Sequence, residues 1–139
     1  MADTDKHSGN AVILRVGMIS LLIALVLAWC LVFTKGMKLP FAVELFKQPD
    51  KLLSAHLDFL MMTMLLLGFF CVRVPLPFMA RWPMAIGSIT NPTCFLIESL
   101  YATHPPAGYM MFVFPSIILT TVGYALACIT LLRWSLRPA

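Results

Sequence analysis

The chain has 139 residues, of which 60% are hydrophobic and only 12% are charged, and its formal net charge at pH 7 is +4. Soluble domains contain about 45–50% apolar and about 25% charged residues, so this composition excludes an ordinary soluble domain. The lysines and arginines lie at the ends of apolar runs. That placement is typical of helices anchored at lipid headgroups and argues against nucleic acid binding.

The predicted elements follow a polar tail at residues 1–10, and we expect a single membrane domain over residues 11–137. Four apolar runs of about twenty residues each predict membrane-spanning helices at 11–33, 52–72, 79–101 and 109–132. The first run is too long for the hydrophobic part of a cleavable signal peptide, so we expect it to be retained. The fold class predicted is an all-α integral membrane four-helix bundle.

The connections between these runs are short and contain helix breakers. Residues 34–51 form the longest connection, and its apolar middle, LPFAVELF, is suited to the membrane interface. The other two connections, RVPLP and THPPAG, each contain two prolines that cannot continue a helix. Short connections predict antiparallel neighbouring helices.

The distribution of positive charge predicts an orientation. Four spans place both termini on one side, and the side with more lysine and arginine is expected to be cytoplasmic. We therefore expect cytoplasmic termini in a bacterial inner (cytoplasmic) membrane. The residues compared are Lys6, Arg15, Arg73, Arg81, Arg133 and Arg137 on the terminal side, against Lys35, Lys38, Lys47 and Lys51.

The cysteines do not form a metal or disulfide pattern. One lies in each apolar run, and no Cys-x-x-Cys is present. We expect neither a disulfide framework nor a cysteine zinc site, but small buried hydrophobic side chains. The four are Cys30, Cys71, Cys94 and Cys128.

Ionisable groups inside membrane spans are costly and indicate function by default. His56 and Thr63 are seven residues apart, as are Asn91 and Glu98, so each pair shares one helix face. We expect the bundle interior to bring these four side chains together in one half of the membrane. Asp58 lies about 200° around the helix from His56, so it faces a third helix, a neighbouring subunit or the interface.

Structural interpretations of the same residues remain open. His56 is also compatible with an interfacial residue near a helix start, and Glu98 with a carboxyl that reaches the headgroups. Asn91 and the neighbouring threonines could instead satisfy backbone groups freed by Pro92. The methionines lack a repeated Met-x-x-Met spacing, so we expect core side chains rather than copper ligands.

His56 is suited to bind a haem. An imidazole projecting from a helix can be the axial ligand of haem iron, and the propionates need a polar edge such as the lysine-bearing connection. The other histidines are His7 in the tail and His104 in the third connection. A single axial ligand leaves one position of the iron open to a substrate.

The run SAHLDFLMM, from Ser54 to Met62, resembles the second helix of a family of small four-span membrane isomerases. The family includes hydroxylaminobenzene mutase and styrene oxide isomerase. The shared pattern is a His at the helix start, then Leu, an acidic residue, a variable position and Leu-Met. Asn91, after a small-residue stretch that starts at Gly87, resembles the mid-helix Asn of the third span. Length, span number and loop sizes agree over essentially the whole chain.

The resemblance implies that His56 is the axial ligand of a haem b bound between the subunits of a trimer. Ferric iron acts there as a Lewis acid on the substrate oxygen. In the epoxide branch, the ring opens to a benzylic cation and a hydride shift gives an aldehyde. In the mutase branch, an aryl hydroxylamine becomes an aminophenol. Neither reaction consumes electrons overall.

The pocket positions implied by the resemblance are Asn91, Met62 and Phe95. The chain departs from the family at two of them, because Met62 stands where the family has Asn and Phe95 where the epoxide isomerase has Tyr. Both changes remove hydrogen-bonding groups. Thr63 and Glu98 are the candidates to replace them.

Three functions follow from these observations. We favour a haem-b-dependent, homo-oligomeric membrane isomerase for a small apolar aromatic substrate that partitions from the bilayer. The alternatives are a non-catalytic haem or quinone electron-transfer protein, with His104 as a second haem ligand, and a structural membrane subunit without a cofactor. The sequence shows no phosphate-binding loop, carboxylate dyad or nucleophile–base pair, which disfavours hydrolases and nucleotide-dependent enzymes.

Overall fold

The computed structural model describes residues 10–103 and 105–136, and every regular element in this part of the chain is a helix. The long helices are α2 (Ala11–Leu31), α4 (Pro49–Cys71), α5 (Phe78–Ser99) and α6 (Tyr109–Ser135). The prediction of an all-α fold is confirmed. His7, His104 and Arg137 lie outside the described residues.

Three of these helices are long and apolar enough to cross a membrane. They are α2 with its continuation to Gly36, α4 and α6. α5 has a comparable length of 22 residues, but Arg81, Asn91, Glu98 and two internal prolines make it more polar. Length and composition therefore establish three candidate spans in the described residues, one fewer than the sequence predicted.

The connection at residues 34–51 contains helical structure that the sequence interpretation did not specify. A π-helix, η1 (Val32–Gly36), continues α2, and a short helix, α3 (Pro40–Leu45), follows it. Pro40 is the first residue of α3 and Pro49 the first of α4, positions where the missing proline N–H has no cost. α4 therefore begins a few residues before the predicted boundary at 52.

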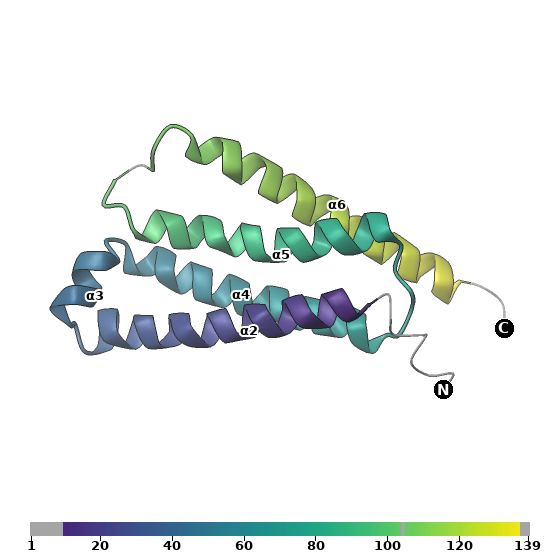
Figure 1. The fold of residues 1–139 in the computed structure, drawn as a ribbon, viewed down its shortest axis with the longest axis horizontal. Helices are drawn as coiled ribbons and strands as arrows, with labels where there is room; N and C mark the ends of the chain where they lie inside the picture. The colour runs from purple at the N-terminus through teal and green to yellow at the C-terminus, as the bar shows by residue number, and fades with distance from the viewer. Residues whose placement is uncertain (1–9, 104, 137–139) are drawn as a thin grey trace.

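The long helices are antiparallel neighbours, and the start of α2 lies at the same end of the bundle as the end of α6 (Figure 1). α2 packs against α4, α4 against α5 and α5 against α6, with a smaller contact between α2 and α5. α6 buries only Ser116, Gly123 and Ala127, and its first turns diverge from α5 (Figure 1). The fourth long helix is therefore attached mainly through α5.

Glycines make the contact between α5 and α6 close. A Cβ atom placed on Gly87 would lie 2.6 Å from the backbone nitrogen of Thr120. A Cβ on Gly123 would overlap the backbone of Met84. Small residues of this kind allow helix backbones to approach in membranes, where association depends on close packing and on polar contacts between helices.

The buried core consists of two apolar clusters with a polar layer between them. One cluster contains Ile13, Leu66, Leu76, Ala80, Met84 and Ala127. The other contains Ala24, Leu27, Phe46, Leu52, Ala55 and Phe59. Three buried hydroxyl residues, Ser20, Thr63 and Ser88, lie between the clusters along their helices. These polar side chains indicate that a site can form in the middle of the bundle.

Candidate functional site

Two polar pairs connect α4 with α5. Lys51 Nζ lies 2.7 Å from Glu98 Oε2, and Asn91 Nδ2 donates a 2.8 Å hydrogen bond to Asp58 Oδ2. On each helix, the two residues that form these pairs are seven residues apart. Because the helices are antiparallel, the pairs follow each other along the interface as two rungs, an outer rung (Lys51–Glu98) and an inner rung (Asp58–Asn91). The rungs run from the end of the bundle toward its middle.

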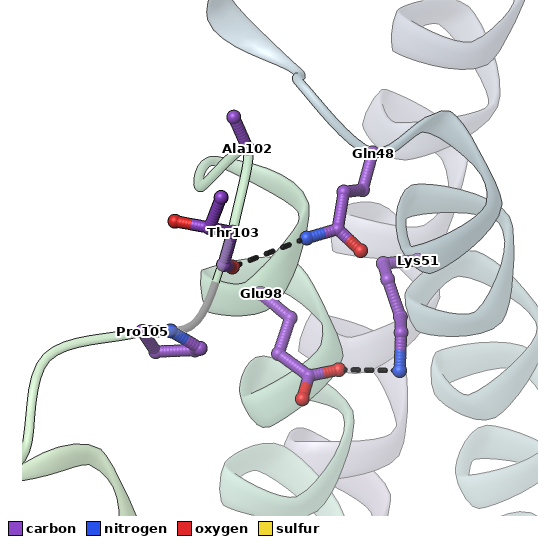
Figure 2. Close-up of a pocket in the computed structure, with 6 residues that line it drawn as sticks. All are labelled: Gln48, Lys51, Glu98, Ala102, Thr103 and Pro105. Atoms are coloured by element: carbon purple, nitrogen blue, oxygen red, sulfur yellow. Dashed lines mark hydrogen bonds and ion pairs between the residues drawn. The ribbon is translucent and has the colours of Figure 1, made fainter.

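A cavity of about 480 Å³ lies at the outer rung. We call it the Lys51 cavity, and its lining residues are Gln48, Lys51, Glu98, Ala102, Thr103 and Pro105. The ammonium of Lys51 and the carboxylate of Glu98 meet across it (Figure 2). Its volume is in the range of small-molecule sites, which are about 300–1,000 Å³.

Gln48 attaches the start of α4 to the connection that follows α5. Its backbone N–H donates to the carbonyl of Ser99 at 3.0 Å, and its side-chain Nε2 donates to the carbonyl of Tyr101 at 2.7 Å. These bonds satisfy carbonyls at the end of α5, which have no partner within the helix. They also hold one wall of the Lys51 cavity in place.

The inner rung is more deeply buried than the outer one. Asp58 is only 8% exposed, and the amide of Asn91 is its hydrogen-bond donor. A carboxyl group at this depth needs a hydrogen-bond partner, because an unpaired polar group in an apolar environment costs several kcal/mol, on the order of 2–7. Asn91 thus stabilises Asp58, a role different from the satisfaction of backbone groups freed by Pro92.

His56 lies on the side of α4 that faces α2. Its Nδ1 is 2.9 Å from the carbonyl oxygen of Ala24. A carbonyl can only accept, so Nδ1 is the donor, and the tautomer with its proton on Nδ1 has the lone pair on Nε2. His56 is half-buried, at the edge between the face covered by α2 and the exposed face that contains Leu53 and Leu57.

Thr63 contacts the same neighbouring helix as His56. Its hydroxyl donates to the carbonyl of Phe59 at 2.8 Å and lies 3.4 Å from the carbonyl of Gly17. The hydroxyl is therefore already used by backbone groups. Thr63 shares the α2-facing side with His56, as the spacing of seven residues predicted.

The polar layer continues from α5 to α6. The hydroxyls of Ser88 and Tyr124 are 2.7 Å apart, and Ser116 donates to Thr90 Oγ1 at 2.8 Å. Thr90, Ser88 and Asn91 thus connect α5 to both of its neighbours. The sequence interpretation did not identify these pairs.

The two positions at which the chain departs from the isomerase pattern lie on the inner side of the helices. Met62 is 5% exposed and follows Asp58 by one turn of α4. The ring of Phe95 lies 5.8 Å from the ammonium of Lys51, a cation–π distance. Phe95 is therefore part of the contacts of the outer rung.

The expected grouping of four side chains is divided between two interfaces. His56 and Thr63 contact α2, whereas Asn91 pairs with Asp58 and Glu98 pairs with Lys51. The prediction that these four form one cluster is wrong because α4 buries two sides of its surface against different helices. The expectation that Asp58 faces away from His56, toward a third helix, agrees with the structure.

Sequence reasoning missed Lys51 and Gln48 as site residues and did not assign Asp58 a partner. The signal was present in the spacing, because Lys51, directly before the second predicted span, is seven residues from Asp58, and Asn91 is seven residues from Glu98 on the third span. When two antiparallel helices carry these residues, Lys51 lies opposite Glu98 and Asp58 lies opposite Asn91.

The described residues contain no group of three or more His, Cys, Asp or Glu side chains arranged to hold a metal ion. A haem iron takes its four equatorial ligands from the porphyrin and needs only one or two from the protein. Comparison with protein-family models, curated proteins and solved structures finds no match to this chain.

Proposed function

We propose that the protein is a membrane-embedded isomerase that uses haem b, held by His56, to rearrange a small aromatic epoxide or aryl hydroxylamine. The observation that carries the proposal is the bond between His56 Nδ1 and the carbonyl of Ala24. Histidines that bind metals usually donate their other ring N–H to a carbonyl or carboxylate, which sets the tautomer and orients the ring. His56 has this arrangement.

Two features of the residues around His56 support haem binding. Nδ1 is used by the carbonyl of Ala24, so Nε2 would be the iron ligand, and the exposed side chains of Leu53 and Leu57 present an apolar surface on the adjacent face of α4. When bound, haem supplies a ferric Lewis acid for the substrate oxygen. The apolar surroundings favour an apolar substrate taken directly from the bilayer.

The other pocket candidates lie at two different interfaces of α4. Thr63 lies on the side of His56, whereas Asn91, Phe95 and Glu98 belong to the α5 interface. In the trimer that the resemblance implies, the second wall of the haem site would come from a neighbouring copy. Within one chain, His56 would hold the iron, and Thr63 lies on the same α2-facing side of α4.

The proposal includes a membrane topology. We propose that α5 is the fourth span, since its 22 residues are enough to cross the hydrocarbon core and its polar groups pair with α4 and α6. Both termini then lie on the side that we expect to be the cytoplasm, and the membrane is a bacterial inner membrane.

The first test is an absorbance spectrum of the detergent-purified protein, with haem supplied during expression. The native chain and His104→Ala should show a Soret band, and His56→Ala should lose it. A native protein without a Soret band would contradict the proposal and favour a structural subunit. A low-spin spectrum that changes in His104→Ala would instead support an electron carrier with two axial histidines.

The second test is turnover of haem-loaded protein on an aryl hydroxylamine and an aryl epoxide. Isomer formation that requires haem and His56 but no added reductant supports the proposal. Full haem loading without turnover of either substrate would contradict the isomerase assignment while leaving haem binding intact.

A further inference from the structure

The two rungs between α4 and α5 connect the Lys51 cavity with a carboxyl group in the middle of the bundle. Seven residues of helix separate Lys51 from Asp58, which is about 10 Å along the axis. The outer rung lines the cavity, and the inner rung is buried. A short path between α4 and α5 therefore separates an open polar space from Asp58.

Lys51 has three roles at the outer end of this path. It lines the Lys51 cavity, pairs with Glu98 at 2.7 Å and lies 5.8 Å from the centre of the Phe95 ring. The side chains of the ion pair are 40% and 24% exposed, so solvent reaches both partners. Displacement of Lys51 breaks the ion pair and removes the contact that covers the Phe95 ring.

Small and apolar side chains occupy the interval between the rungs. Ala55 is fully buried and lies one turn from Lys51 on α4. Cys94 is 6% exposed and lies between Asn91 and Glu98 on α5, at the α6 side of this interval, where its thiol contacts Ser116. Phe95 packs against the apolar cluster that contains Ala55, and Ala55 contributes only a methyl group to this interval.

We propose that the Lys51 cavity is an aqueous vestibule and that the Lys51–Glu98 pair, with the Phe95 ring beneath it, gates the passage of water and small polar solutes to the Asp58–Asn91 pair. When the ion pair is intact, the interval is closed. When it opens, the Phe95 ring loses its covering cation and can turn aside from Ala55. Asp58 then exchanges protons and polar ligands with one face of the membrane only.

The physical basis of the proposed gate is the difference in solvent exposure between the two rungs. A partly exposed ion pair is weak, because water competes for both partners, so the outer rung opens at low cost. The carboxyl of Asp58 is costly to keep in an apolar interior and gains from contact with water. The inference requires neither haem nor isomerase activity, so it can fail or succeed independently of the proposed function.

Cys94, whose thiol borders the passage next to Ser116 of α6, is a native reporter of solvent access to it. In a variant with Cys30, Cys71 and Cys128 replaced by Ala, Cys94 is the remaining thiol. The protein is reconstituted in lipid vesicles and treated on both sides with a small, cationic, membrane-impermeant methanethiosulfonate. The rate of modification is measured by mass spectrometry, and complete modification in SDS verifies that the thiol is reactive.

Glu98→Gln and Lys51→Met should each raise the rate of Cys94 modification roughly fivefold, the factor expected for loss of one partly exposed ion pair. The matched control is Lys35→Met, which removes the exposed Lys35–Asp50 pair (2.6 Å) but lines no part of the Lys51 cavity. Its rate should equal that of the parent.

Three results would overturn the inference. Modification that is unchanged in both Glu98→Gln and Lys51→Met would show that the ion pair is not a gate. An equal increase in Lys35→Met would indicate general loosening of the bundle end. A parent thiol that already reacts as fast as in SDS would show an open passage without a gate.

Discussion

Asn91 donates a 2.8 Å hydrogen bond to Asp58 across the interface of α4 and α5. This hydrogen bond holds a carboxyl group within the bundle. Asp58 is 8% exposed, so little solvent reaches it. The pair therefore affects both the stability of the interface and the chemistry available there.

Removal of both partners should cost less than the sum of the two single removals. We expect Asn91→Leu to lower the free energy of unfolding by about 1–3 kcal/mol, because it leaves a buried acceptor without its donor. Asp58→Leu should have a similar effect, and the double variant should be less destabilised than the sum of the single changes. Thermal unfolding in lipid–detergent micelles measures each value.

The matched control for this cycle is Thr121→Val, which changes an exposed side chain on α6. It should alter the free energy of unfolding by less than about 0.5 kcal/mol. Strictly additive single effects for Asp58 and Asn91 would contradict an energetic coupling between them.

The close approach of α5 and α6 should depend on Gly123. A Cβ there would overlap the backbone of Met84, and backbone cannot yield as a flexible side chain can. We expect Gly123→Ala to destabilise the protein by about 1–3 kcal/mol or to displace α6. The measurements are the unfolding midpoint and the protease sensitivity of the connection before α6.

Gly68 provides a matched control in α4, since a Cβ placed there meets no heavy atom within 4 Å. Gly68→Ala should be neutral or stabilising by up to about 1 kcal/mol, because alanine favours the helix. Equal destabilisation by both substitutions would show that close packing is not the cause.

Asn10 should fix the connection between α4 and α5. Its side chain is 1% exposed, donates to the carbonyl of Val74 at 2.9 Å and accepts from the N–H of Leu76 at 3.4 Å. We expect Asn10→Ala to lower the free energy of unfolding by about 1–3 kcal/mol and to accelerate hydrogen exchange at Leu76.

Asn10→Asp separates the two bonds, because a carboxylate still accepts from Leu76 but cannot donate to Val74. Hydrogen exchange at Leu76 should be faster in Asn10→Ala than in Asn10→Asp. Native exchange rates in both variants would contradict the role of this side chain.

Ser20 differs from the other buried hydroxyls, because its Oγ has no hydrogen-bond partner in the described structure. Ser20→Ala removes an unsatisfied polar atom and should leave the unfolding midpoint unchanged or raise it. Thr63→Val is the comparison, because it removes a hydroxyl bonded to Phe59 and should lower the midpoint. A marked loss of stability in Ser20→Ala would reveal a partner supplied by a ligand or a second copy.

The sequence by itself determined the four long helices, because their length, apolar composition and proline boundaries are local properties of the chain. It also separated His56 from Asp58, since a shift of two residues turns a helix by about 200°. α5 is not among the candidate spans for the same local reason, because Asn91, Glu98 and its prolines lower its apolar character.

Only the tertiary structure decided which polar groups meet. Periodicity identifies the residues that share a face of one helix but leaves open which neighbour covers that face and at what height. The packing of α4 against both α2 and α5 separated His56 and Thr63 from Asn91 and Glu98. The antiparallel register of α4 and α5 placed Lys51 at Glu98 and Asp58 at Asn91, because contacts between helices depend on their relative rotation and displacement.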